Sequence, residues 1–482
     1  MKKIFLPAII FFLIVNAVHY PAAALELHEE CVPPVKQFVL YLESYDFGGG
    51  VNKIVLHTKK PVFEKQIAVK DFEIEWGRGT RTVQDAYLCD PNGLRLPLSA
   101  AADGAEFVAI ELYCGPDENC NPFAGTMFFG SKEIIKIEIE NDEIGFSSKK
   151  CAGIVNHSAS KFKIDEYTSS RMTLQYAYYL PGNPEAFRDS NIEVISDSEK
   201  IPLIIWFHAV GEGGKNPYVP LFGQRAVNLA EEKIQSYFEN GAAVLVPLSP
   251  TSWLETVELD AMGNKVWAPV DVFSKMDKLS VAVANAIDEK RTGGKNQVKE
   301  DEHPADSYYT VDVKELIDAF ITKNPRIDTS RIYIGGCSAG GYMTLNMIFN
   351  YPDYFAAAFP VCAAYPDSRI TDSNIEVLRR TPVWFVLSLA DQTVNPEPHT
   401  LKTFARIKAA ADGTMPPDAG SEPDAHLTTF EKVIDLSNQY KGADGGAFEY
   451  DGHFSWIYVL NDRVSENGTS LFRWLSGCRL PQ

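Results

Sequence analysis

The chain has 482 residues, which suggests more than one domain, and its formal net charge at pH 7 is −19. A chain this acidic is a poor partner for nucleic acid and for anionic membrane surfaces. Its eight cysteines are too few for a disulfide-dense scaffold. No phosphate-binding loop, dinucleotide-binding fingerprint or zinc-ligand spacing occurs, so we expect neither a cofactor nor a catalytic metal.

Residues 1–24 have the features of a secretory signal peptide. Lys2 and Lys3 precede an apolar run over 4–18, and small residues follow at 21–24. Neither this run nor any later segment reaches the ~20 apolar residues that a membrane helix needs. We therefore expect a secreted or periplasmic protein with no membrane span after signal cleavage.

Residues 33–160 predict a β-sandwich domain, because short strand-like runs alternate polar and apolar residues and are separated by Gly, Asn and Asp. The clearest runs are Phe38–Leu42, Lys53–His57, Phe107–Tyr113 and Ile134–Glu140. No catalytic cluster is evident here. The domain is either a stabilising or spacing module, a lip over the active site, or a carbohydrate-binding module.

Cysteines are concentrated in the N-terminal third of the chain. Export would permit disulfides among them, but their connectivity cannot be predicted from the sequence. These residues are Cys31, Cys89, Cys114, Cys120 and Cys151. Cys337 and Cys362 fall in predicted core strands, where we expect free buried thiols.

Residues 166–480 alternate predicted strands and helices. Strand-like runs cover Met172–Tyr179, Pro202–His208 and Ala242–Pro247, and an amphipathic helix is predicted over 311–320. This alternation indicates a mostly parallel sheet with helices on both faces.

A glycine-rich loop follows the second of these strands, over His208–Gly214. A loop in this place can supply a backbone N–H to an oxyanion, and we assign that role to Val210. Glu212 could contact substrate, although a simple turn carboxylate is the alternative. His208 is expected to be structural.

The segment 251–308 is predicted to be an insertion between sheet elements, apolar at its start and charged at its end. Trp253 and Trp267 are candidates for shaping an acyl or sugar pocket. The alternative is that both tryptophans pack in the interior, which is their more common role.

The segment Gly336–Gly340 places Ser338 between two glycines, after a strand-like run and before an amphipathic run. This is the context of a nucleophile elbow, in which the serine occupies a tight strand-to-helix turn. Glycine is needed there because a Cβ would prevent the close approach of strand and helix. The N–H of Ala339, at the helix start, is the second predicted oxyanion donor.

Two further candidate catalytic residues, an aspartate and a histidine, follow Ser338 in the chain. Asp391 comes after the buried run Val383–Leu389, and His453 lies in a loop before the apolar run Trp456–Leu460. The order Ser, Asp, His is that of α/β-hydrolases. The imidazole would take the serine proton while the carboxylate fixes its tautomer. The competing acids are Asp451, Asp367 and Asp372.

Several of these motifs together resemble the esterase and prolyl-oligopeptidase-like branch of the α/β-hydrolases, including polyhydroxybutyrate depolymerases and feruloyl esterases. The matching stretches are His208–Gly214, Val246–Glu255, Arg331–Thr344, Tyr351–Cys362, Ala390–Val394 and Gly452–Trp456. The resemblance implies a Ser338–Asp391–His453 triad and an immunoglobulin-like domain ahead of the hydrolase.

The chain departs from this family at two positions. The chain has His208-Ala209 where the family usually has His-Gly, which weakens the oxyanion assignment. Phe454 replaces the cysteine that follows the histidine in fungal-type feruloyl esterases and tannases, so their disulfide arrangement is absent.

We therefore predict an exported serine hydrolase that cleaves small-molecule or polymer-linked carboxylic esters through an acyl-enzyme on Ser338. A peptidase of the prolyl-oligopeptidase-like type is the alternative enzyme. A non-catalytic carbohydrate- or wall-binding protein on a hydrolase scaffold is the alternative outside enzymes, because a fold does not fix a function. The sequence leaves the oligomeric state open.

Overall fold

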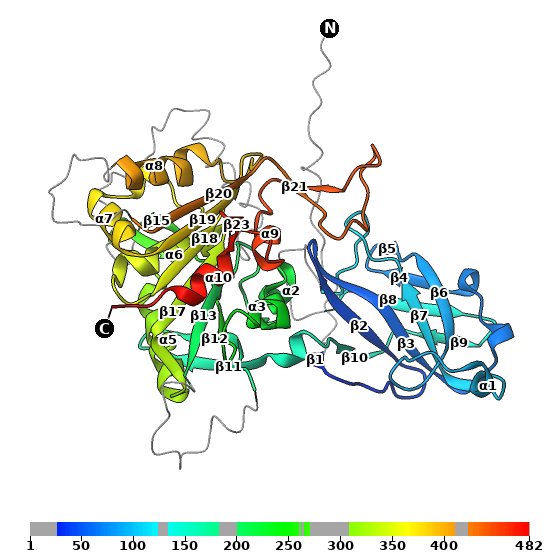
Figure 1. Cartoon of the computed structure of the whole chain (residues 1–482). Helices are drawn as coiled ribbons and strands as arrows, with labels where there is room; N and C mark the ends of the chain where they lie inside the picture. Colours follow the sequence, from blue (N-terminus) through cyan, green and yellow to red (C-terminus); the bar gives the residue numbers. More distant parts are fainter. Residues whose placement is uncertain are drawn as a thin grey trace, which may run out of the picture.

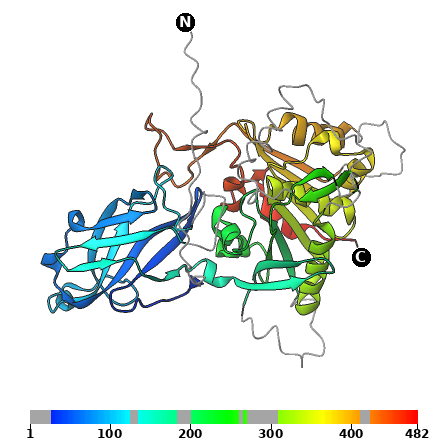
Figure 2. The same cartoon turned by 180° about the vertical axis from the view of Figure 1, so that it is seen from behind.

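A computed structural model describes residues 27–123, 134–182, 200–259, 262, 265–269, 308–409 and 423–481. The predicted signal peptide, 1–24, and most of the predicted insertion lie outside these residues. The described chain forms an all-β part and an α/β part that lie side by side (Figure 1). Figure 2 shows the same arrangement from behind.

The all-β part contains two sheets, a six-stranded one in the order β1-β10-β2-β3-β7-β6 and a four-stranded one in the order β5-β4-β8-β9. Apolar side chains of both sheets, among them Phe38, Ile54 and Ile139, are fully buried in one core. The strands are β1 Leu27–His28, β2 Phe38–Tyr45, β3 Gly48–Val62, β4 Glu73–Trp76, β5 Gly79–Thr80, β6 Val83–Cys89, β7 Ala105–Leu112, β8 Ile137–Asn141, β9 Phe146–Ser148 and β10 Cys151–Val155. The expected all-β character is therefore present, while an immunoglobulin-like topology remains a prediction.

The α/β part is built on an eight-stranded sheet in the order β11-β12-β14-β13-β17-β18-β19-β20. Strand β12 is antiparallel to β11 and β14, and the strands from β14 to β20 are parallel neighbours. The strands are β11 Lys163–Thr168, β12 Thr173–Tyr179, β13 Ile201–Phe207, β14 Ala243–Leu248, β17 Ile327–Cys337, β18 Ala357–Val361, β19 Val383–Ser388 and β20 Ala425–Phe430. Their carboxyl ends share one edge of the sheet, where open α/β sheets place their sites.

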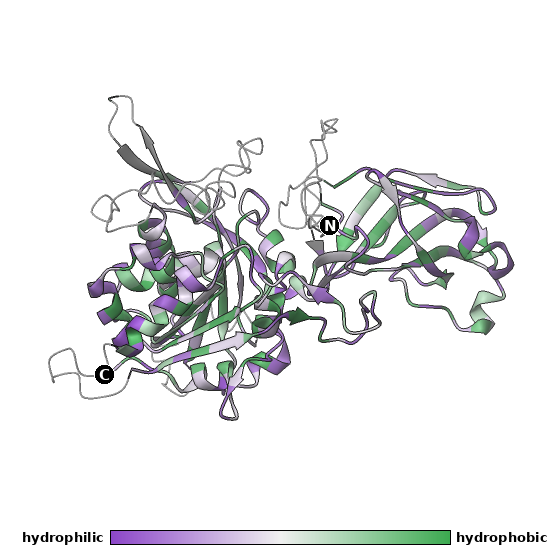
Figure 3. Ribbon diagram, turned by 90° about the horizontal axis from the view of Figure 1, so that it is seen from above, coloured by the Kyte–Doolittle hydropathy of each residue, from purple (hydrophilic) through white to green (hydrophobic). Residues whose placement is uncertain are grey.

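Helices cover both faces of this sheet. Along β13, Leu203 and Ile205 join the cluster that includes α5 and α6, whereas Ile204 and Trp206 join the one that includes α2 and α10. Burial on both faces explains why β13, β14, β18 and β19 are almost continuous apolar runs. Figure 3 colours the whole chain by hydropathy. The α-helices are α2 Val219–Gly223, α3 Glu232–Gln235, α5 Thr310–Lys323, α6 Ala339–Asn350, α7 Asp372–Arg380, α8 Lys402–Ala409, α9 Trp456–Leu460 and α10 Leu471–Gly477, besides α1 Leu98–Ala101 in the all-β part.

Smaller elements decorate the α/β part, and two of them fall in the predicted insertion. Strands β15 and β16 form an antiparallel hairpin in which Val257 pairs with Trp267. The short strands are β15 Glu255–Leu259, β16 Lys265–Pro269, β21 Val433–Ile434, β22 Glu449–Tyr450, β23 Ser465–Glu466 and β24 Thr469–Ser470. Short 3-10 or π-helical turns are η1 Glu64–Gln66, η2 Val69–Asp71, η3 Ala159–Lys161, η6 Ala226–Ala230, η9 Asp367–Arg369 and η10 Glu397–Leu401.

The tip between β2 and β3 packs against the α/β part. The Asp46 carboxylate accepts hydrogen bonds from Arg225 and from Asn461, which lies just after α9. A Cβ on Gly49 would lie 3.1 Å from the Phe222 side chain of α2. This hairpin tip therefore touches segments that follow the glycine-rich loop and the His453 loop.

All eight cysteines lie within the described residues, and each is a free thiol. The disulfides considered for the N-terminal third are therefore not formed in this structure. The predicted burial of Cys337 and Cys362 is observed, with exposed fractions of 0% and 3%.

Candidate active site

Ser338 occupies the sharp turn between β17 and α6. Its backbone has φ 56° and ψ −117°, a conformation that is costly for a residue with a side chain. The turn can close because Gly336 and Gly340 lack side chains: a Cβ on either would lie 2.5 or 2.0 Å from the Phe207 carbonyl oxygen. The local geometry is that of the predicted nucleophile elbow.

The backbone of the neighbouring strand holds this turn in place. The Ser338 N–H donates to the Val361 carbonyl oxygen at 2.9 Å, and the Ala364 N–H donates to the Ser338 carbonyl oxygen at 3.0 Å. These bonds offset the strain of a positive φ by fixing the residue on both sides. Ser338 is 7% exposed.

His453 and Asp391 meet across two loops. Nδ1 of His453 lies 2.7 Å from Oδ2 of Asp391, and the His453 ring is nearly buried. The other carboxylate oxygen, Oδ1, accepts the N–H groups of Thr393 and Val394 at 2.9 and 2.8 Å. Asp391 is thus held with one oxygen directed at the imidazole, which fixes the Nδ1–H tautomer.

The loop that carries His453 lies directly on the turn that carries Asp391. A Cβ on Gly452 would lie 2.3 Å from the Ala390 carbonyl oxygen, so only glycine permits this approach. Burial lowers the pKa of His453, but the Cys362 sulfur and the Asp391 carboxylate outweigh burial and raise it above its ordinary value. The site therefore favours the imidazolium that would form when the ring accepts a proton.

The competing acids have other partners. Asp451 accepts the backbone N–H of His453 at 2.8 Å, which is a local turn contact. Asp367 is held by Arg406, Thr403 and Lys402. Asp372, at the start of α7, pairs with Arg406. Of the acids considered from the sequence, only Asp391 is hydrogen-bonded to the His453 ring.

The two predicted oxyanion donors lie on the two segments expected to supply them, the start of α6 and the loop after β13. Ala339 is the first residue of α6, where a helix leaves its N–H groups without intrahelical partners. Val210 is half-buried after β13, and its N–H forms no backbone hydrogen bond within the described residues. Their role as oxyanion donors remains a prediction.

Glu212 is placed differently from our expectation of a substrate contact. Its side chain is fully buried, and Oε2 accepts the Ala209 N–H at 2.8 Å. Burial raises the pKa of Glu212 well above its ordinary value and so favours the neutral carboxyl group. The structure corrects the prediction of a substrate contact, because Glu212 is fully buried. Its carboxyl group instead stabilises the glycine-rich loop by accepting the Ala209 N–H.

His208 is the structural residue that the sequence suggested. Nδ1 lies 2.8 Å from the Ala209 carbonyl oxygen, and Nε2 accepts the Ser249 N–H at 3.1 Å. Complete burial lowers the pKa of His208 to about 4, which keeps the ring neutral. Together with Glu212, this ring ties the glycine-rich loop to the end of β14.

The tryptophan predictions have separate outcomes. Trp253 is 0% exposed and packs against His208, Phe207 and Tyr309, so the structure corrects its proposed pocket role to one of interior packing. The backbone of Trp267 lies in β16, but its side chain is outside the described residues.

Cys362 is the residue near the triad that our sequence reasoning did not connect with it. It follows β18, the strand between those that precede Ser338 and Asp391. One ligand atom from each of Cys362, Asp391 and His453 lies within 4.8 Å of the other two. Its place at the end of a predicted core strand, next to the elbow strand, was the signal that could have identified it.

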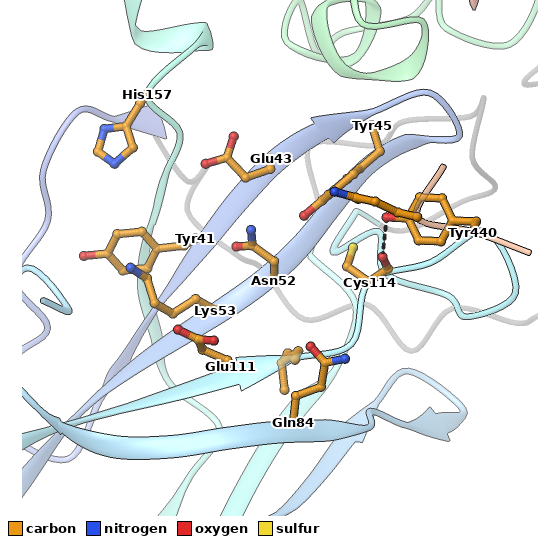
Figure 4. A pocket seen from close by; sticks show the side chains of 12 residues that line it. Tyr41, Glu43, Tyr45, Asn52, Lys53, Gln84, Glu111, Cys114, His157 and Tyr440 are labelled. Atoms are coloured by element: carbon orange, nitrogen blue, oxygen red, sulfur yellow. Dashed lines mark hydrogen bonds between the residues drawn. The ribbon is translucent and has the colours of Figure 1, made fainter. Parts of the chain in front are cut away.

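A separate cavity of about 400 Å³ lies on the β-sheet domain (Figure 4). Its walls are mainly polar side chains of the six-stranded sheet, closed at one end by Tyr440 of the α/β part, whose hydroxyl donates to the Cys114 carbonyl oxygen at 2.7 Å. Ser338, Asp391 and His453 are not among its walls. This cavity is therefore distinct from the candidate triad.

Comparisons with known proteins agree with this architecture. Residues 305–378 match the Prolyl oligopeptidase family. Over 78 residues, the chain is 36% identical to Poly(3-hydroxyalkanoate) depolymerase C from Paucimonas lemoignei. That alignment covers 15% of this chain and 19% of the depolymerase, so the match spans about a fifth of that relative's length.

The solved structure of a thermostable esterase is similar over nearly the whole molecule. The match covers 92% of this chain and 100% of the esterase, with a TM-score of 0.59 and 19% sequence identity. The expected α/β-hydrolase fold is thereby confirmed. The family match and the esterase and depolymerase similarities support a serine hydrolase of the esterase or prolyl-oligopeptidase type.

Among the helices of the described residues, none combines the length and the apolar character that crossing a membrane requires.

Proposed function

We propose that this protein is an exported serine hydrolase that cleaves carboxylic esters through a Ser338 acyl-enzyme. The observation that carries the proposal is the coexistence of a strained elbow serine with a His453–Asp391 pair 2.7 Å apart. Both features lie beyond the carboxyl ends of β17 and β19, parallel strands separated only by β18. Export rests on the charged and apolar pattern of residues 1–24.

The reaction follows from the chemistry of these groups. The His453 imidazole removes the Ser338 proton as Oγ attacks the ester carbonyl carbon, and Asp391 stabilises the imidazolium. The N–H groups of Ala339 and Val210 would stabilise the oxyanion. Collapse of the tetrahedral intermediate expels the alcohol, which takes the proton from His453. Water activated by the same imidazole then releases the acid and regenerates Ser338.

An ester substrate is favoured over a peptide by two observations. An exopeptidase needs a charged clamp for the substrate terminus, and Glu212, the acidic residue of the glycine-rich loop, is fully buried, which raises its pKa and favours the neutral form. The similarity to a thermostable esterase and to a poly(3-hydroxyalkanoate) depolymerase points in the same direction. A peptidase is the second candidate, because residues 305–378 match the Prolyl oligopeptidase family.

A non-catalytic binding protein is disfavoured by the energetics of the elbow. A serine held at φ 56° costs of order 1–3 kcal/mol, and such strain is usually retained at functional positions. The buried His453–Asp391 pair at the same edge of the sheet likewise has a use in catalysis and none in simple binding.

Purified mature protein should be assayed with p-nitrophenyl acetate and butyrate, feruloyl and acetyl-sugar esters, and aminoacyl-nitroanilides. We expect kcat/KM for the activated esters to exceed that for every anilide. Faster cleavage of a dipeptide or prolyl anilide would establish the peptidase instead. Absence of all turnover, together with no labelling by a fluorophosphonate, would favour the binding protein.

A further inference from the structure

Cys362, Asp391 and His453 form a compact cluster of a thiol, a carboxylate and an imidazole. One ligand atom from each lies within 4.8 Å of the other two, and the residues are 3%, 3% and 7% exposed. The proposed reaction uses the carboxylate and the imidazole but has no role for the thiol.

The backbone fixes the position of this thiol. Cys362 has φ 37°, an uncommon conformation for a residue with a side chain, and its N–H donates to the Val386 carbonyl oxygen at 2.8 Å. Cys362 therefore lies between the ends of β17 and β19, the strands that precede Ser338 and Asp391. The thiol is part of a built arrangement and is not a lone surface cysteine.

Thiolate, imidazole and carboxylate are the three side-chain ligand types of protein zinc sites. Bond lengths of about 2.3 Å to sulfur and about 2.0–2.2 Å to nitrogen and oxygen place tetrahedral ligand atoms roughly 3.3–3.7 Å apart. The observed separations are within 4.8 Å, so modest side-chain rotations would bring all three ligand atoms onto one ion. Three protein ligands leave a fourth position for water.

We propose that Cys362, Asp391 and His453 bind Zn²⁺ and that the bound ion reversibly inhibits the hydrolase. Binding removes the proton from the Cys362 thiol and releases it to solvent, because the thiolate is the metal ligand. The imidazole binds through a deprotonated nitrogen, and the Asp391 carboxylate is diverted from it. The triad can then neither orient the imidazole nor transfer the serine proton.

Inhibition rests on the proposed function, whereas binding of the ion does not. Binding should therefore be measured on the full chain carrying Ser338→Ala, by calorimetry with Zn²⁺ alone and by metal analysis after dialysis. We expect one ion per chain. Adding Cys362→Ala or the closer isostere Cys362→Ser should weaken binding at least tenfold. Cys478→Ala, which removes another buried thiol, should leave binding unchanged.

In the parent protein, Zn²⁺ should inhibit ester hydrolysis and a chelator should restore it, while Mg²⁺ at equal concentration should have no effect, since thiolate sites disfavour hard cations. Each variant is compared with its own uninhibited rate. The Zn²⁺ concentration for half-inhibition should rise at least tenfold in Cys362→Ala and Cys362→Ser. Equal inhibition of the parent and both variants, or no ion bound by the Ser338→Ala chain, would overturn the proposal. A chain that binds Zn²⁺ through Cys362 but hydrolyses nothing would instead refute the proposed function.

Discussion

The carboxylate of Asp46, on the tip of the β2–β3 hairpin, lies 2.9 Å from the guanidinium of Arg225 in the α/β part. The same Asp46 oxygen accepts the Asn461 amide at 2.7 Å. The Asp46 side chain is 8% exposed and that of Arg225 is 33% exposed, so water screens this pair only in part. A single acid of one domain thus joins two segments of the other.

Asp46→Ala should lower the free energy of unfolding by about 1–3 kcal/mol, because it removes the charged acceptor that Arg225 and Asn461 share. Urea denaturation monitored by fluorescence would measure this change. Asp103→Ala, at an exposed turn of the same domain, is the matched control and should change stability by less than about 0.5 kcal/mol. Equal effects of the two substitutions would show that the junction contributes nothing specific.

Ser338→Ala should reduce kcat by roughly 10⁶-fold if the three groups act as a unit. It should also abolish covalent labelling by a fluorophosphonate. Ser476→Ala, in α10 and remote from the elbow in sequence, should preserve both activity and labelling. Labelling that persists in Ser338→Ala would place the nucleophile at another serine.

Asp391→Asn should lower kcat by roughly 10⁴-fold, because an amide no longer selects the productive imidazole tautomer. Asp451→Asn is the control, since an asparagine oxygen can still accept the His453 backbone N–H. Steady-state kinetics with one activated ester would compare them. The assignment of the acid fails if Asp451→Asn is the more damaging substitution.

Gly340→Ala should prevent a properly closed elbow, because its Cβ would lie 2.0 Å from the Phe207 carbonyl oxygen. We expect a loss of stability above about 2 kcal/mol, the cost of forcing backbone apart in a packed interior, together with loss of activity. Gly477→Ala at the end of α10 meets no atom within 4 Å and should be neutral or slightly stabilising. Thermal unfolding and the ester assay would test both, and a fully active Gly340→Ala protein would contradict this account of the turn.

Glu212→Gln should change how stability depends on pH. The folded-state pKa of Glu212 lies well above the ordinary value of 4.5. At pH values between 4.5 and the folded-state pKa, the Glu212 carboxyl group is ionised in the unfolded chain but protonated in the folded chain. The free energy of unfolding of the parent therefore falls as pH rises through this window, by up to ~1.4 kcal/mol per pH unit from this group.

Glutamine has no such proton, so the stability of Glu212→Gln relative to the parent should increase as pH rises above about 5. Urea unfolding at a series of pH values would measure the difference. Glu232→Gln, at an exposed position in α3, should follow the parent curve. If the curve for Glu212→Gln runs parallel to the parent curve, Glu212 is ionised in the folded protein.

Local sequence patterns determined much of the α/β part. The helix expected over 311–320 is α5, Thr310–Lys323, and the apolar run Trp456–Leu460 is α9. The glycine spacing around Ser338 predicted the elbow because that turn forms from consecutive residues whose steric limits are intrinsic. In the all-β part, the strand expected over Ile134–Glu140 is β8, Ile137–Asn141, so its existence was predicted better than its start.

Only the tertiary structure decided the burial and the contacts of side chains that are surrounded by segments distant in the sequence. Asp391 rather than Asp451 contacts the His453 ring because the two loops cross at Gly452. Trp253 and Glu212 are enclosed by packing that no local pattern encodes. Cys362 lies close to Asp391 and His453 because β18 lies between β17 and β19. Backbone conformation follows from neighbouring residues, whereas burial, ionisation and contact depend on which remote strands pair.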